Sequence, residues 1–114
     1  MNIIAIDPIL TAEKAEAMRV TKTESREELA KAADFITIHV PFLPATEKMI
    51  NAEFLSNCKS DVVILNSSRG EIVDDEAMIA ALNANPNMMY CGDVYSGEPA
   101  LKECEFTHPV AQHA

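Results

Sequence analysis

The sequence is poor in glycine and in basic residues. Its 114 residues include three glycines, Gly70, Gly92 and Gly97. None belongs to a GxGxxG turn, the motif that brings a backbone close to a dinucleotide phosphate. Lysine and arginine total 9 against 18 aspartates and glutamates, for a formal net charge of −9. Because nucleic-acid affinity depends on basic side chains that neutralise phosphates, this balance argues against a nucleic-acid partner.

Long apolar runs and paired cysteines are absent as well. No segment approaches the roughly 20 apolar residues of a membrane-spanning helix, and the apolar start at residues 1–6 is too short for a signal peptide. Cys58, Cys91 and Cys104 form an odd, widely spaced set without a CxxC pair or a nearby histidine at ligand spacing. We therefore expect reduced thiols, no metal, no membrane partner and a cytoplasmic location.

Short apolar runs alternate with segments of helical pattern. We expect strands at residues 2–6, 35–40, 61–65 and 88–94, and a brief edge strand at 19–22. Helices are expected at 12–18, 25–33, 52–58 and 74–85, with Thr11, Ser25, Asn51 and Asp74 at their starts.

This alternation predicts an α/β fold. The strand interiors are apolar without a polar alternation, which is typical of strands covered on both faces. Strands separated by helices then favour a doubly wound, Rossmann-like parallel sheet with helices on both faces. We expect one domain at residues 1–100 and an irregular tail at 101–114.

Polar residues follow the expected strands, where open parallel sheets bind their ligands. Asp7 follows the first strand, and residues 39–41, 67–70 and 93–99 follow three later ones. The sequences there are IDP at 6–8, HVPFLPAT at 39–46, ILNSSRGEIVDDEAM at 64–78 and GDVYSGEP at 92–99. In order and approximate spacing these four stretches resemble the cofactor domain of the D-2-hydroxyacid dehydrogenases. The resemblance implies NAD as cofactor and hydride transfer between NADH and a small 2-keto acid.

The resemblance also implies roles in cofactor binding. Asp7 would bind the ribose hydroxyls of NAD and repel the 2′-phosphate of NADP, although an aspartate before proline is equally typical of a turn. His39, Val40 and Pro41 would form the wall beside the adenine, and Thr46 would lie near the pyrophosphate or ribose. By itself, His39 is more typical of a structural histidine than of an acid or a ligand.

On the nicotinamide side, the resemblance places Ser68 against the ribose and Asp93 at the carboxamide. Arg69 would hold the carboxylate of the 2-keto acid and polarise its carbonyl, whereas an isolated arginine before glycine is usually a surface residue. Glu98 would orient a catalytic histidine. For that histidine the chain offers His113 and, as a poorer match, His108.

The resemblance leaves the strand, glycine loop and helix that open such a domain unmatched, together with the substrate domain. In the strand order 3-2-1-4-5-6 the unmatched strand is central, between the strands at 2–6 and 35–40. Either these two strands pair directly, or an exposed edge recruits a second chain, so we expect a homo-oligomer or a rearranged sheet.

The sequence admits three functional interpretations. The first is the cofactor-binding part of an NAD-dependent dehydrogenase, which we expect to be inactive in isolation. The second is a non-catalytic, self-associating or nucleotide-binding module derived from that fold. The third, a receiver-like signalling domain, fits poorly because it requires an acidic pair after the first strand and a lysine after the last.

Overall fold

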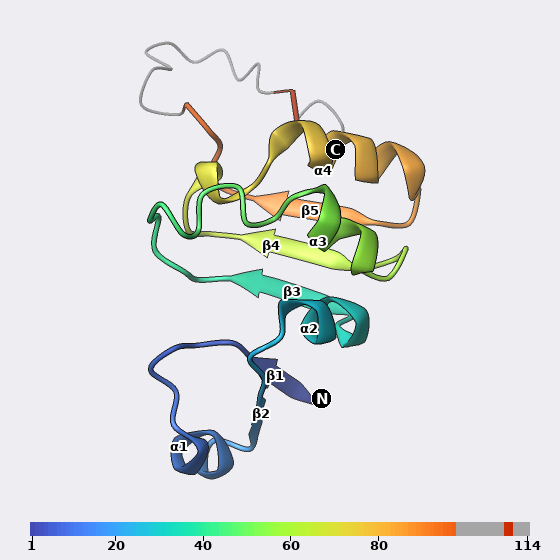
Figure 1. The fold of residues 1–114 in the computed structure, drawn as a ribbon. Coiled ribbons are helices and arrows are strands. Elements are labelled where there is room, and N and C mark those ends of the chain that lie inside the picture. The colour runs from blue at the N-terminus through green and yellow to red at the C-terminus, as the bar shows by residue number, and fades with distance from the viewer. Residues whose placement is uncertain (98–108, 111–114) are drawn as a thin grey trace.

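The computed structural model describes residues 1–97 and 109–110. Its strands and helices alternate along the chain, as the sequence predicts (Figure 1). The strands are β1 Ile3–Ala5, β2 Val20–Lys22, β3 Phe35–Ile38, β4 Val63–Asn66 and β5 Met89–Gly92. The helices are α1 Ala12–Ala17, α2 Arg26–Ala32, α3 Ala52–Asn57 and α4 Asp75–Ala84, and a 3-10 helix, Gly70–Ile72, follows β4.

Each of these α-helices begins at a side chain that caps its first turn. A side-chain oxygen accepts a hydrogen bond from the backbone N–H three residues later, which satisfies a group that has no partner within the helix. The capping residues are Thr11, Ser25, Asn51 and Asp74, with N···O distances of 3.0 to 3.3 Å. The predicted helix starts are therefore confirmed.

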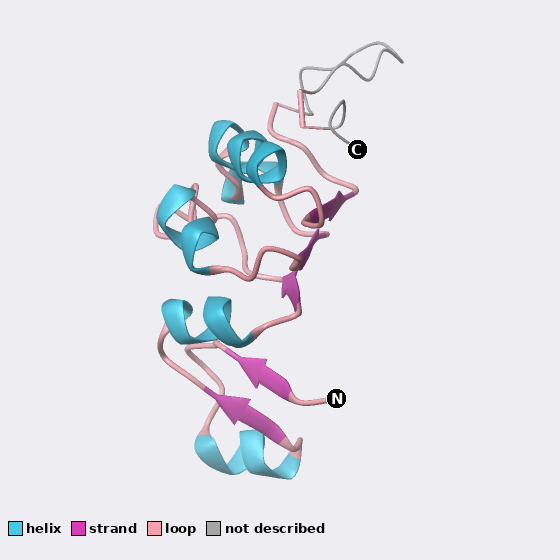
Figure 2. Ribbon diagram, turned by 90° about the vertical axis from the view of Figure 1, so that its right-hand side faces the viewer, coloured by secondary structure: helices cyan, strands magenta, loops and turns pink. Residues whose placement is uncertain are grey.

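The strands that the structure describes form two parallel sheets. β1 pairs with β2, and the second sheet has the order β3-β4-β5. In Figures 1 and 2, β1 lies between β3 and β2, yet no strand pairing joins it to β3. Direct pairing of these two strands, one of the two arrangements predicted, is thus not found in the described part of the chain.

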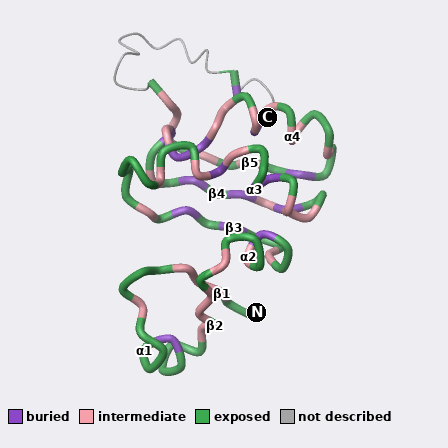
Figure 3. The backbone as a smooth tube through the Cα atoms, viewed as in Figure 1, coloured by how far each residue is buried: buried purple, intermediate pink, exposed green. Residues whose placement is uncertain are grey.

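The hydrophobic core lies between the three-stranded sheet and the helices α2, α3 and α4. Alternate residues of β3 and β4, Ile36, Ile38 and Ile64, are buried in it, and the buried segments concentrate in this part of the molecule (Figure 3). Val110, from the segment expected to be an irregular tail, is also part of the core. Complete burial of such a side chain contributes about 1.5–3 kcal/mol to folding.

The opposite face of the three-stranded sheet is uncovered in the described structure. Phe35, Leu65 and Met89 are 71%, 39% and 54% exposed there, and Figure 2 shows α2, α3 and α4 together on the other side of the strands. The expectation that the strand at 35–40 is covered on both faces is therefore wrong for the residues described. The connections through α3 and α4 advance in the same direction across the three-stranded sheet, and right-handed crossovers then place both helices on one face.

We call this side of the sheet the uncovered face. It consists of two rows of residues in register, Phe35–Val63–Met89 and Thr37–Leu65–Cys91. Among the helices within the described residues, none has both the length and the apolar character needed to span a bilayer.

Candidate functional site

The carboxyl ends of β3, β4 and β5 meet at one edge of the sheet. The three strands are parallel, and Ile38, Asn66 and Gly92 are in register at their ends. The loops that follow therefore leave the sheet side by side, as Figure 1 shows. These are the loops that carry most of the polar residues singled out in the sequence.

Asn66 organises this edge. It is the buried polar side chain of the described core, 2% exposed. Its Nδ2 donates to the carbonyl oxygen of Arg69 at 2.9 Å and to the Tyr90 hydroxyl at 3.3 Å, and its Oδ1 accepts from the Ser68 N–H at 3.0 Å. One side chain thus shapes the loop after β4 and links it to β5.

Ser68 connects the same loop to the loop after β3. Its hydroxyl donates a short hydrogen bond to the carbonyl oxygen of Val40. Residues that follow two neighbouring strands are thereby held together, as expected for a site at strand ends. We call Val40, Asn66, Ser68, Arg69 and Tyr90 the strand-end cluster.

Gly70 allows the loop after β5 to pack against the loop after β4. A Cβ atom at this position would lie 2.0 Å from the carbonyl carbon of Tyr95 and 2.1 Å from the Ser96 nitrogen. Both are backbone atoms, so no side-chain rotation would relieve the clash. Gly70 is therefore required here by lack of space.

Arg69 is exposed and has no carboxylate within ion-pair distance among the residues described. Its Nη1 donates to the carbonyl oxygen of Ser68 at 2.8 Å. A guanidinium has five N–H donors, so the group remains able to bind an anion. Because no described carboxylate forms an ion pair with it, the guanidinium is available to an external anion.

The loop after β3 is held by its own hydrogen bonds. The Thr46 hydroxyl donates to the Pro41 carbonyl oxygen at 2.6 Å and accepts from the Leu43 N–H at 2.9 Å. The Nε2 of His39 lies 2.8 Å from the Thr37 hydroxyl oxygen. Thr46 thus shapes the chain around Pro41, and these contacts agree with a structural part for both Thr46 and His39.

Asp7 forms the turn after β1. Its Oδ1 accepts from the Ile9 N–H at 2.8 Å, and its carbonyl oxygen accepts from the Leu10 N–H at 3.2 Å. The turn interpretation of this aspartate is therefore confirmed. It leaves Oδ2 exposed, so a second role in binding a hydroxyl is compatible with the turn.

Asp93 follows β5 and is exposed. Its charge reaches Tyr90, whose pKa is raised chiefly by burial, is lowered by the hydrogen bond from Asn66, and is raised further by nearby groups that include Asp93. Asp93 is therefore electrostatically close to the strand-end cluster. Glu98, His108 and His113 lie outside the described residues, so the proposed acid and its carboxylate partner are not placed.

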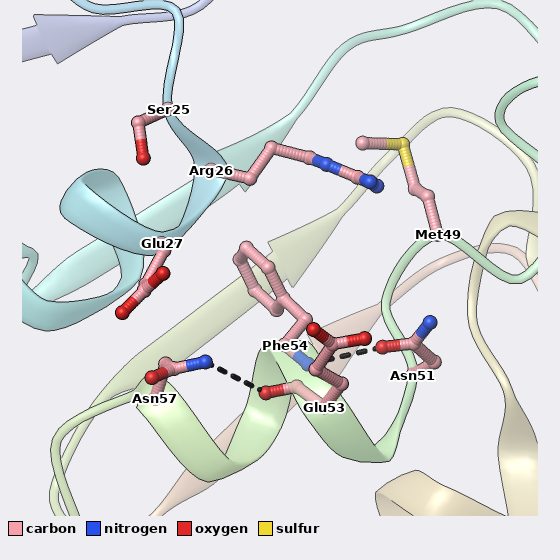
Figure 4. A pocket seen from close by; sticks show the side chains of 8 residues that line it. All are labelled: Ser25, Arg26, Glu27, Met49, Asn51, Glu53, Phe54 and Asn57. Carbon is pink, nitrogen blue, oxygen red and sulfur yellow. Dashed lines mark hydrogen bonds between the residues drawn. The ribbon is translucent and has the colours of Figure 1, made fainter.

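A cavity of about 280 Å³ lies elsewhere, between the first turns of α2 and α3 (Figure 4). Its lining comprises Ser25, Arg26, Glu27, Met49, Asn51, Glu53, Phe54 and Asn57. None of the residues predicted for the site is among them. Nor do the residues described contain a group of three or more histidine, cysteine, aspartate or glutamate side chains placed to hold a metal ion.

Asn66 and Tyr90 are site residues that the sequence did not predict. The available signal was the interruption of an apolar strand by a polar residue directly before the Ser-Ser-Arg-Gly loop. A buried asparagine must satisfy several hydrogen-bonding groups, so its position at a strand end marks it as an organiser of the adjoining loop.

Comparison with known proteins matches this chain to one family. The sequence profile of the D-isomer specific 2-hydroxyacid dehydrogenase NAD-binding domain matches residues 1–113. D-3-phosphoglycerate dehydrogenase of Methanocaldococcus jannaschii is 39% identical over 99 residues, covering 87% of this chain and 19% of the relative. D-lactate dehydrogenase of Lactobacillus delbrueckii subsp. bulgaricus is 47% identical over 78 residues, covering 68% of this chain and 23% of the relative.

The fold matches solved structures of the same group. The crystal structure of D-lactate dehydrogenase with NAD+ from Lactobacillus jensenii superposes with a TM-score of 0.83 and 26% identity. The match covers 98% of this chain and 34% of that one. The chain thus spans about a fifth of the length of the curated relatives named above and about a third of this solved chain.

Proposed function

The chain belongs to the D-isomer specific 2-hydroxyacid dehydrogenase family, within its NAD-binding domain, and we propose that its strand ends bind the adenosine and nicotinamide parts of NAD. The observation that carries this proposal is the strand-end cluster. Hydrogen bonds from Asn66 and Ser68 bring three strand ends into one polar site. The relatives are named for 2-hydroxy acids such as D-lactate, and a substrate of that class is proposed for the whole protein.

The donor and acceptor set suits NAD. We assign the exposed oxygen of Asp7 to the adenosine ribose and the chain at His39, Val40 and Pro41, shaped by Thr46, to the adenine wall. Ser68 and Asp93 are assigned to the nicotinamide ribose and carboxamide. The Ser68 hydroxyl donates its proton to the Val40 carbonyl oxygen. The Ser68 oxygen would therefore accept a hydrogen bond from the nicotinamide ribose. This sequence contains no GxGxxG turn, and Thr46 is the residue that we place near the pyrophosphate or ribose.

Arg69 is proposed to bind the substrate. Its planar group can hold a carboxylate through two parallel N–H bonds and polarise the adjacent carbonyl of a 2-keto acid. Bound NADH would supply the hydride. His113 is proposed as the acid that delivers the proton, and Glu98 as the carboxylate that orients its imidazole.

The proposal is tested by titrating the chain with NADH and with ADP-ribose in a thermal-shift assay. A ligand that binds only the folded state raises the unfolding temperature with concentration. The matched variant Asp7→Asn keeps an oxygen for the Ile9 N–H but removes the charge, so it should narrow the preference for NADH over NADPH. No shift at millimolar NADH or ADP-ribose would reject the proposed site.

A second candidate is a non-catalytic module that self-associates, and the open strand edges favour it. Both β1 and β3 have one edge without a strand neighbour among the residues described, and such edges pair readily with other chains. We propose a homo-oligomer formed through the open edges of β1 and β3.

A cytoplasmic location is proposed as well, since Cys58 and Cys91 are free thiols.

A further inference from the structure

The cavity between α2 and α3 is separate from the proposed NAD site. Its lining contains none of the residues assigned to the nucleotide or to the substrate carboxylate. Its volume is about 280 Å³, just below the range of roughly 300–1,000 Å³ that is usual for drug-sized ligands. The cavity therefore suits a small molecule better than a dinucleotide.

The apolar part of the lining consists of Phe54 and Met49. Phe54 is 9% exposed and belongs to the hydrophobic core, and Met49 packs against that core. An aromatic ring and a flexible thioether side chain can pack on a hydrocarbon group of varied shape. This part of the cavity therefore favours a ligand with an apolar group.

The charged part of the lining contains an arginine and a glutamate that have no ion-pair partner. Arg26 comes from α2 and Glu53 from α3, and both are exposed. Neither forms an ion pair with any residue that the structure describes. The other lining carboxylate, Glu27, is paired with Lys31. One positive and one negative group of the cavity are thus available to a ligand.

Two asparagine amides in the lining add a donor and an acceptor. The Asn51 Oδ1 accepts from the Phe54 N–H at 3.0 Å, which leaves its Nδ2 as a donor. The Asn57 Nδ2 donates to the Glu53 carbonyl oxygen at 3.0 Å, which leaves its Oδ1 as an acceptor. Figure 4 shows the Arg26 side chain extending from α2 towards Met49, while the two asparagines enter from the α3 side.

We propose that this cavity binds a free α-amino acid with an apolar side chain. Its carboxylate would bind Arg26, its ammonium group would bind Glu53, and its side chain would pack on Phe54 and Met49. A simple carboxylate would leave Glu53 uncompensated and a simple amine would leave Arg26 so, whereas a zwitterion complements both charges. The two asparagine amides would complete the donor and acceptor sets.

The test titrates L-leucine into the isotope-labelled 114-residue chain and follows its amide signals by NMR. We expect saturable shifts at the Phe54 backbone amide and at the side-chain amides of Asn51 and Asn57, with a dissociation constant of roughly 1 mM. Leucinamide lacks the carboxylate, and 4-methylpentanoate lacks the ammonium group. Each of these two matched ligands should bind about tenfold more weakly than leucine.

Two variants assign the charges of the ligand to their partners. Arg26→Gln should weaken leucine binding about tenfold and abolish the preference for leucine over leucinamide. Glu53→Gln should instead abolish the preference for leucine over 4-methylpentanoate. Both residues are exposed, so circular dichroism should show an unchanged fold. Lys14→Gln and Glu16→Gln remove the same charges at exposed positions of α1 and should bind leucine as the wild-type chain does.

Three results would overturn the amino-acid site: no saturable shift at Phe54, equal binding of the three ligands, or unchanged ligand preferences in Arg26→Gln and Glu53→Gln. An ion pair between Arg26 and Glu53 that closed the cavity would give the first of these. NADH is added separately to the leucine complex, and displacement of leucine by NADH would assign the cavity to the nucleotide instead. Leucine binding in a chain that does not bind NADH would sustain the amino-acid site and count against the NAD proposal alone.

Discussion

Asn66 and Tyr90 join β4 to β5 through their side chains, with the Asn66 Nδ2 3.3 Å from the Tyr90 hydroxyl oxygen. Gly92, which is in register with Asn66, leaves space for this contact. A Cβ atom at Gly92 would lie only 3.2 Å from the same hydroxyl. A polar pair therefore closes the core at the point where the strands end and the proposed binding loops begin.

Asn66→Ala should destabilise the chain by about 2 kcal/mol, because the Ser68 N–H and the Arg69 carbonyl oxygen lose their partner in a partly buried setting. Urea unfolding followed by circular dichroism measures this change. Asn83→Ala, at an exposed position of α4, is the matched control and should leave stability unchanged or slightly higher. Equal effects of the two substitutions would show that Asn66 does not organise the loop.

Gly70→Ala should displace the loop after β5, because its Cβ would overlap the backbone of Tyr95. We expect a loss of about 1–3 kcal/mol together with a changed near-ultraviolet signal from tyrosine. Gly97→Ala is the control, since Gly97 has φ +73° and open space around it. That variant should lose only about 1 kcal/mol from backbone strain, with the tyrosine signal retained.

Tyr90 should make the fold sensitive to alkali. Burial raises the pKa of Tyr90 above its usual value of about 10. Above that pH the unfolded chain loses the tyrosine proton before the folded chain does, so the free energy of unfolding falls as pH rises. Absorbance at 295 nm should show a late ionisation that Tyr90→Phe abolishes, and a stability that is flat with pH above 10 in the wild-type chain would contradict the burial.

Cys58 and Cys91 should differ in reactivity. Burial raises the pKa of the Cys58 thiol to about 11, and its Sγ lies 3.5 Å from the Phe54 carbonyl oxygen. Cys91 is exposed on the uncovered face. In a Cys104→Ser background at pH 7.5, iodoacetamide should modify Cys91 at least about tenfold faster than Cys58, as mass spectrometry would measure. The reverse order would contradict the placement of β5.

Local patterns in the sequence were enough to predict the elements. Thr11, Ser25, Asn51 and Asp74 cap helices where the sequence places them, because a cap depends on groups only three residues apart. The strands were found because apolar runs of strand length are local as well. The likeness of four loop sequences to one family was also readable, since loops at strand ends carry the binding groups.

The sequence alone therefore determined the order of strands and helices, the α/β class and the family. Only the tertiary structure decided three features of the described residues: β1 and β3 do not pair, one sheet face is uncovered, and Asn66 and Tyr90 hold the strand ends together. The physical reason is that each of these outcomes depends on groups distant in the chain. Whether an apolar strand residue such as Leu65 is buried is decided by the side on which the crossovers place their helices, and no local pattern encodes that side.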